Sequence, residues 1–310
     1  MINRELVRLK VVQLVYAYKV NKKTTWSTAE KELELSLSKA YDMYLYLLHS
    51  LTKVHALAVT HHESALSRVR RLGYGEPDER MKALAHNRML WQLSENAALV
   101  DFRANRWKDW EDEDSFVAGM LRKWIDCGCI DNYLQKVENP TYEDDRKLVR
   151  ELYKACYMGN DDLESRFEDN GIYWNDDKSI IDSFVIKTIK KFDETKGSEH
   201  ELLPAFSNGD DEKFAYSLFR HTLEQGDDEI HMIAEASHKW SVDRMAVMDL
   251  VIVQTALAEL VNFPLIGVGV TINEYINIAK VYSTPDSARF VNGVLASIVT
   301  RLRDNNVIPK

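Results

Sequence analysis

Side chains that could do chemistry form few catalytic patterns in this sequence. Residues 267–269 read Gly-Val-Gly, which lacks the third glycine of a dinucleotide-binding loop, and no GxxxxGK[ST] phosphate loop is present. Cys127, Cys129 and Cys156 could bind a metal, but small buried residues are the better interpretation of one Cys-x-Cys motif. Residues 61–63 read His-His-Glu, and adjacent histidines point about 100° apart on a helix. We therefore expect no catalytic residue, no metal site and no cofactor.

Cationic and aromatic side chains share one side of the first predicted helix, residues 2–20. Arg8, Tyr16 and Lys19 lie within about 80° of arc when each residue turns the helix by ~100°. Cations can pair with phosphates, and an exposed ring can stack on an unpaired base for ~1–3 kcal/mol. This pattern is compatible with nucleic-acid binding. From this helix alone, however, the slightly favoured interpretation is that Tyr16 packs in the core and the cations only solvate the helix.

Charge is unevenly distributed along the 310 residues, whose formal net charge is −9. Residues 1–23 contain six basic side chains and one acidic side chain, whereas residues 24–205 contain 25 basic and 34 acidic side chains. Residues 206–310 contain nine basic and 14 acidic side chains. The acidic chain as a whole argues against a nucleic-acid partner, but its basic first segment is a local exception.

Helical periodicity dominates the sequence, and the strand signal is poor. In residues 2–20 apolar side chains recur at spacings of four, three and four from Val7 to Tyr18, which places them on one helical face. A long apolar-periodic stretch follows from about residue 28 to 59. Further helices are expected near residues 79–105, 114–135, 141–158, 161–169, 178–193, 212–224 and 228–240. With only 12 glycines and six prolines in the chain, we predict an all-α bundle.

Helix-start signals precede the last three predicted helices. Ser241 is an expected N-cap for a long apolar helix. Thr271 and Glu274 have the spacing of a capping box, which predicts a helix start at Thr271 after a loop over residues 265–270. Residues 284–286 read Thr-Pro-Asp, which predicts a cap, a proline at the first helical position and an acid in the first turn.

The expected compartment is the cytoplasm. The first twenty residues contain no uninterrupted apolar run and no small-residue cleavage site, so we expect no secretory signal. No window reaches the ~18 apolar residues of a membrane span. Three cysteines are an odd number, and they do not suggest a disulfide framework.

A specific family signal lies in residues 271–295. The segments NEYINIAK and DSARFVNGVL reproduce almost in full the pattern INEAVELAK…DS.KFVNGVLD, so the chain resembles the NusB transcription antitermination factors. Shorter segments agree with this resemblance. Residues 240–244 match the family's W…DR segment, residues 256–260 match its ALYEL segment, and residues 8–16 resemble its opening helix.

The resemblance also implies a domain organisation. It covers residues 2–20 and about 211–305, which is close to the length of a complete ordinary member. Residues 24–205 have no counterpart there. We therefore expect a NusB-like RNA-binding domain of two helical subdomains from residues 1–23 and 206–310, interrupted by an all-helical insertion of unknown role. The alternative is that the early helices are greatly extended.

By this resemblance the chain is a transcription factor and not an enzyme. Members of the family pair with the small-subunit ribosomal protein NusE. The pair binds the single-stranded boxA element of nascent ribosomal RNA in the transcription elongation complex, and RNA polymerase then reads through terminators. No membrane is involved. Some members dimerise and mask the RNA surface, so a homodimer is also open.

The resemblance, together with charge, assigns functional positions residue by residue. The expected RNA-binding residues are Arg4, Arg8, Lys10, Tyr16, Lys280, Asp286, Arg289 and Phe290. The cations would contact phosphates, the two rings would stack on bases, and Asp286 would accept a hydrogen bond from a base or ribose. Phe290 could equally be a core anchor. Asp249 matches an acidic position near the partner surface and is the expected partner-binding residue.

Other functions remain open at this stage. The chain could be a protein-interaction scaffold that keeps the NusB fold without binding boxA RNA. It could also resemble the NusB-like domain of an RNA methyltransferase, although the missing glycine-rich cofactor loop argues against that function. Glu5 and Leu6 occupy two places of a denser arginine run in the family, which predicts that the intrinsic RNA affinity is lower or is shared with the insertion.

Overall fold

The computed structural model describes residues 1–21, 25–108, 110, 112–136, 139–174, 177–206, 208–225, 227–237 and 245–308. Throughout these ranges the regular structure is helical, and the extended pairing is one isolated parallel bridge between Ile2 and Phe206. The prediction of an all-α fold is therefore confirmed. Among the described helices, none is both long enough and apolar enough to cross a membrane.

The chain divides into two compact units. The terminal unit comprises residues 2–38 and 205–310, and the central unit comprises Met1 and residues 39–204. Helix α2 (Trp26–Leu72) contributes its first part to the terminal unit and the rest to the central unit. The first boundary differs from the expected one, because residues 25–38 belong with the terminal unit. There, for example, Trp26 stacks on Phe219 with ring centroids 6.1 Å apart. Residues 22–24, where that boundary was expected, lie outside the described ranges.

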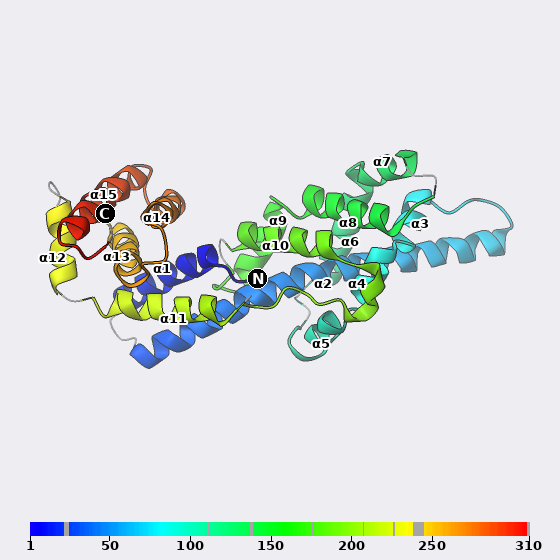
Figure 1. Ribbon diagram of the computed structural model, residues 1–310. Coiled ribbons are helices and arrows are strands. Elements are labelled where there is room, and N and C mark those ends of the chain that lie inside the picture. Colours follow the sequence, from blue (N-terminus) through cyan, green and yellow to red (C-terminus); the bar gives the residue numbers. More distant parts are fainter. Residues whose placement is uncertain are drawn as a thin grey trace. The chain divides into compact units, whose positions relative to one another are not determined.

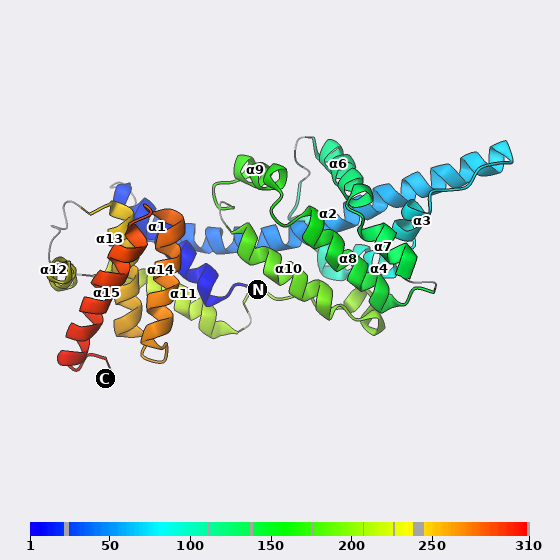
Figure 2. The ribbon, with the colours of Figure 1, turned by 90° about the horizontal axis from the view of Figure 1, so that it is seen from above.

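Helix α13 (Val247–Asn262) is the central helix of the terminal unit. Every side chain from Val251 to Leu260 is buried, because this segment is mostly apolar and neighbouring helices surround it. Those neighbours are α1 (Arg4–Val20), α11 (Gly209–Leu223), α12 (Asp227–Ala236), α14 (Val268–Tyr282) and α15 (Ser287–Asp304), as Figures 1 and 2 show.

The start of α1 is fixed from two sides. The Ile2 amide donates to the carbonyl of Ala205 at 2.6 Å, and this pairing holds the beginning of the chain beside the segment that precedes α11. The side chain of Asn3 then caps α1 by accepting from the Leu6 amide at 3.0 Å. The first helix and the C-terminal helices therefore form one bundle although about 180 residues of sequence separate them.

The central unit contains the remainder of α2 and a set of shorter helices. These are α3 (Glu79–Ala85), α4 (Arg88–Ser94), α5 (Ala97–Asn105), α6 (Glu113–Asp126), α7 (Cys129–Lys136), α8 (Tyr142–Cys156), α9 (Asp161–Asn170), α10 (Lys178–Lys191) and the 3-10 helix η1 (Glu194–Glu199). Part of its core is an aromatic cluster of Tyr46, Trp107, Trp110, Phe167 and Trp174, with ring centroids 4.3 to 6.2 Å apart.

Several helix predictions need correction. The stretch expected over residues 114–135 is two helices, α6 and α7, with Gly128 at a φ of +72° between them. The single helix expected over residues 79–105 is three helices, because Asn87 and Asn96 act as N-caps and interrupt it by accepting from the Leu90 and Leu99 amides. Helix α14 begins at Val268 rather than at Thr271, with Gly267 as the N-cap residue. Thr271 therefore lies inside the helix and forms no capping box there. Ser241 and the rest of residues 240–244 lie outside the described ranges, and the apolar helix expected after them begins at Val247.

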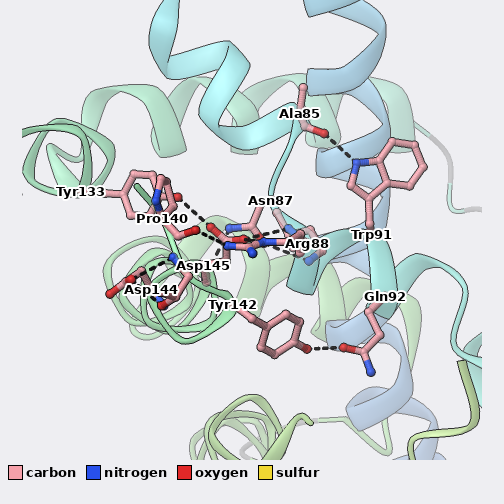
Figure 3. A network of polar contacts seen from close by, with 12 residues as sticks. Ala85, Asn87, Arg88, Trp91, Gln92, Tyr133, Pro140, Tyr142, Asp144 and Asp145 are labelled. Atoms are coloured by element: carbon pink, nitrogen blue, oxygen red, sulfur yellow. Dashed lines mark hydrogen bonds and ion pairs between the residues drawn. The ribbon is translucent and has the colours of Figure 1, made fainter. Parts of the chain in front are cut away.

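Asp145 is a polar hub that joins three helices of the central unit (Figure 3). Its side chain is 3% exposed, and it accepts from Nε of Arg88 at 2.8 Å, from the Arg88 amide at 3.1 Å and from the Tyr133 hydroxyl at 2.7 Å. The Asn87 amide nitrogen donates to the Asp145 carbonyl at 3.2 Å. One carboxylate thus ties α4 and α7 to α8, and burial makes each bond costly to lose.

Replacing Asp145 with alanine is expected to lower the free energy of unfolding by about 2–3 kcal/mol, because hydrogen bonds to a charged group disappear and buried donors lose their acceptor. Urea titration followed by circular dichroism measures this change. The control is Asp162→Ala, since the Asp162 carboxylate is 81% exposed in its ion pair with Lys123 and its loss should leave stability nearly unchanged. Equal losses in the two variants would contradict the role of Asp145.

Candidate nucleic-acid interface

A buried ion pair connects the first helix to the rest of the terminal unit. The Arg8 guanidinium is 4% exposed and grips the fully buried Glu259 carboxylate with two hydrogen bonds, at 2.8 and 2.9 Å. Glu259 also accepts from the Thr271 hydroxyl at 2.8 Å and from the Tyr275 hydroxyl at 3.0 Å. All of its acceptor positions are therefore used, and α1, α13 and α14 are joined at one point.

The protonation states of this network follow from its contacts. Burial lowers the pKa of the Arg8 guanidinium, but the hydrogen bonds and charge of Glu259 outweigh it and hold that pKa above its ordinary value. Burial and the Glu259 carboxylate raise the pKa of Tyr275 well above its usual range, so the phenol remains a donor. Burial also raises the pKa of Glu274, which lies 3.7 Å from the Arg8 guanidinium.

Arg8 and Lys10 do not lie where the sequence analysis expected them. Lys10 is 1% exposed, and neither side chain is presented to a ligand in solution. Val12 lies on the same side of α1 as Arg8 and is fully buried. The N-terminal half of that side of the helix therefore belongs to the core. For Arg8 the burial has a physical cause, because the Glu259 carboxylate sits in the bundle interior and needs a counter-charge there.

Of the four residues of α1 that were expected to bind RNA, Arg4 and Tyr16 lie at least partly at the surface. The Arg4 side chain is 44% exposed, lies 3.2 Å from a carboxylate oxygen of Asp211 and covers the ring of Phe214. Tyr16 is partly exposed near the C-terminal end of the helix. One turn earlier, Gln13 donates to the Tyr282 hydroxyl at 3.2 Å and so connects this part of α1 to the end of α14.

Asp249 holds the turn between α14 and α15. It is 7% exposed, and its two carboxylate oxygens accept from the hydroxyls of Ser283 at 2.6 Å and of Ser287 at 2.9 Å. The Ser287 hydroxyl also lies 3.2 Å from the Thr284 amide. The residue expected to bind a partner thus has a structural role as well, because it fixes the segment that precedes Phe290. Sequence analysis overlooked both serines, although Ser287 directly follows Asp286 in the family-like motif.

A small pocket lies directly beside this turn. Its volume is about 190 Å³, and its lining residues are Met245, Ala246, Asp249, Thr284, Asp286, Ser287 and Phe290. Asp286 is exposed at the rim, and Phe290 is half-buried in the wall. Helix α15 begins at Ser287, so the proline-initiated start expected at residue 285 is a turn instead, and it displays Asp286 outward. The structure therefore brings Asp249, Asp286 and Phe290 together at one site.

The other predicted cations lie on the surface of the same two helices. Lys280 is exposed near the end of α14 and donates to the Asn277 side chain at 3.2 Å. Arg289 is exposed in the first turn of α15, one residue before Phe290. Within the described ranges no cluster of three or more histidine, cysteine, aspartate or glutamate side chains could hold a metal ion.

Fold and site together define the class: within the described residues it is an all-helical protein with a small pocket, lined by acids, hydroxyl groups and one aromatic ring, between the ends of its packed helices. Comparison with known proteins identifies the family. A model of the NusB family matches residues 180–300. The transcription antitermination protein NusB of Geotalea daltonii is 36% identical over 133 residues, which cover 43% of this chain and 89% of that protein.

Further relatives agree with this match. The NusB proteins of Salinibacter ruber and Thermodesulfovibrio yellowstonii are 33% and 35% identical over 132 and 153 residues, covering 82% and 87% of those proteins. They cover 41% and 49% of this chain. No solved structure matches the chain. The chain belongs to the NusB family and is longer than these members. The family match begins inside α10, in the central unit, rather than at residue 206.

The ion pair generates the first prediction for this site. Arg8→Met is expected to lower the free energy of unfolding by about 3–5 kcal/mol, because it leaves the Glu259 carboxylate buried without its counter-charge. The double variant Arg8→Met/Glu259→Gln should be more stable than Arg8→Met, since a neutral amide can still accept from Thr271 or Tyr275. Urea unfolding of both variants decides the matter, and a double variant no more stable than the single one would count against the pair.

Substitutions at Asp249 and Asp286 should show that the buried Asp249 stabilises the turn before α15 and that the exposed Asp286 does not. Asp249→Ala is expected to destabilise the protein by about 1–3 kcal/mol, because two serine hydroxyls lose their buried acceptor. Asp286→Ala should leave stability nearly unchanged, since that side chain is exposed at the pocket rim. Thermal unfolding measures both variants. A larger loss at Asp286 than at Asp249 would refute this assignment.

Proposed function

We propose that this protein is a transcription antitermination factor that binds boxA-type single-stranded RNA of nascent ribosomal transcripts. The observation that carries the proposal is the pocket in which Asp249, Asp286 and Phe290 meet, in a chain of the NusB family. Its relatives carry the name transcription antitermination protein. In this proposal the protein acts in the cytoplasm and is not an enzyme.

In this proposal different residues at the surface make different kinds of contact with RNA. The half-buried ring of Phe290 offers a stacking surface at the pocket, and Tyr16 offers a second ring on α1. Asp286 at the rim accepts a hydrogen bond from a base amino group or a ribose hydroxyl. Arg4, Lys280 and Arg289 contact phosphates. Arg8 and Lys10 support the first helix from inside and make no contact in this assignment.

The protein acts with a partner. In the proposed complex the ribosomal protein NusE binds beside the RNA, and the pair joins the transcription elongation complex so that RNA polymerase reads through terminators. Asp249 serves this surface indirectly, because it holds the turn of residues 283–287 through Ser283 and Ser287. A homodimer that covers the same surface would compete with RNA. The assignment of residues 1–23 and 206–310 as a NusB-like domain with an inserted domain is part of the same proposal.

Phe290→Leu is expected to weaken binding of a boxA oligonucleotide by at least about fivefold, because leucine fills similar space but offers no ring for stacking. Tyr16→Ala should act in the same direction, and Tyr16→Phe should retain affinity. Fluorescence anisotropy with labelled RNA, in the presence of NusE, measures these changes. Raised salt should also weaken binding.

The control variant is Val281→Ala, because Val281 is 67% exposed on α14 and lies outside the pocket. A scrambled RNA is the control ligand. Equal binding of boxA and scrambled RNA would overturn the proposal and favour a protein-interaction scaffold. Unchanged affinity in the Phe290 and Tyr16 variants, with boxA still preferred, would move the RNA site elsewhere on the protein.

A further inference from the structure

The far end of α2 carries a concentrated positive charge in an otherwise acidic part of the chain. Arg68, Arg70 and Arg71 occupy the last turns of this helix, and all three are exposed. Residues 64–75 contain no acidic side chain. In Figure 1 this end of α2 and the loop that leads back to α3 are drawn in light blue and cyan. We call residues 68–75 the α2 tip.

The arginines of the α2 tip are placed differently from many cations of the central unit. Lys82, Arg146 and Lys154 each lie one helical turn from an acidic partner, namely Glu79, Glu143 and Glu151. By contrast, no acidic residue stands three or four positions from Arg68, Arg70 or Arg71. Arg68 and Arg71 are themselves three positions apart, and like charges at this spacing destabilise a helix.

The turn after the helix brings an aromatic ring to the same place. Gly73 and Gly75 have φ values of +76° and +95°, which side chains other than glycine rarely adopt, and the Gly73 amide donates to the Val69 carbonyl at 2.8 Å. A Cβ atom on Gly75 would lie 3.9 Å from the side chain of Val69, so the loop folds back against the last turns of α2. Tyr74, between the two glycines, is 73% exposed.

We propose that the α2 tip is a second RNA-binding surface, at which the three arginines contact phosphates and Tyr74 stacks on an unpaired base. Arginine presents a planar fork that matches a phosphate, and an exposed ring offers a platform of similar chemistry to every base. The proposal rests on the proposed function, because it takes single-stranded RNA as the ligand. It goes beyond that function because it assigns RNA contact to the central unit.

The helix dipole alone also favours cations at a helix C-terminus. The end of α10 provides a control that separates this effect from RNA binding. Lys187, Lys190 and Lys191 are exposed at the end of α10, in the same kind of position and with the same total charge. There, however, Lys191 lines a pocket together with Asp193 and Glu199, so the local charge is mixed. Neutralising the lysines therefore reproduces the changes in net charge and in helix dipole without removing the proposed site.

The experiment compares the full-length protein with Arg68→Gln/Arg70→Gln/Arg71→Gln and with Lys187→Gln/Lys190→Gln/Lys191→Gln. Binding of a labelled single-stranded RNA that contains boxA and extends beyond it is measured by fluorescence anisotropy over a range of salt concentrations. The arginine variant is expected to bind about tenfold more weakly, with a salt slope smaller by about two, since each phosphate contact in a single strand contributes ~0.7. The lysine variant should change affinity less than twofold.

Tyr74→Ala tests the ring, with Tyr74→Phe as its control. The alanine variant should weaken RNA binding by about fivefold or more, and the phenylalanine variant should retain it. Circular dichroism verifies that each variant keeps its helix content. Equal effects of the arginine and lysine variants, or no effect of the arginine variant, would overturn the second surface and leave these arginines to an acidic protein partner or to the helix dipole.

Crosslinking separates this inference from the proposed function. RNA that contains 4-thiouridine is irradiated with the wild-type protein, and crosslinked peptides are identified by mass spectrometry. Crosslinks both in residues 64–78 and near Phe290 support both sites. Crosslinks near Phe290 alone refute the α2 tip and leave the proposed function standing. Crosslinks in residues 64–78 alone support the α2 tip and refute the pocket, and an absence of crosslinks in both regions refutes both.

Discussion

The bidentate pair between Arg8 and Glu259 is the interaction on which the terminal unit depends. Two charges in a helical interior lose their hydration, and their attraction offsets that cost only when the remaining hydrogen-bonding positions are also filled. Here the Thr271 and Tyr275 hydroxyls fill them. One register of α1 against α13 and α14 satisfies the whole network, so the pair selects an arrangement as well as stabilising it.

The same principle shapes the pocket at the other end of α14. Asp249 is buried, like Glu259, and its carboxylate is satisfied by hydroxyl groups from the turn before α15. A buried acid therefore orders a turn that precedes α15, and Asp286 and Phe290 beside it line the pocket. The two acids of the pocket therefore differ in role: Asp249 holds the turn, and Asp286 faces the solvent at the rim. Both are aspartates, so the difference in role comes from their burial and not from their residue type.

The helical fold could be predicted from the sequence because periodicity and composition report burial of one helical face, and the family motif over residues 271–295 includes three residues that line the candidate pocket, Asp286, Ser287 and Phe290. The roles of single residues were less accessible. An arginine such as Arg8 is usually found on a protein surface. The sequence does not show that Arg8 pairs with Glu259, which lies 251 positions later in the chain. The start of α14 was misplaced because glycines at 267 and 269 favour a loop locally, whereas the helix, which packs against α13, begins directly after Gly267 and includes Gly269.

The small number of exposed cations limits the electrostatic attraction that the terminal unit alone could exert on RNA. Part of the positive charge that the sequence concentrates in residues 1–23 does not face solvent, since Arg8 and Lys10 are buried. Among the proposed contacts, Arg4, Lys280 and Arg289 remain as exposed cations. Three phosphate contacts give a salt slope of only about −2 on a single strand, which corresponds to weak electrostatic attraction. In the proposed function, tight RNA binding therefore requires contacts from elsewhere, and the two proposed sources are the partner protein and the arginines of the α2 tip.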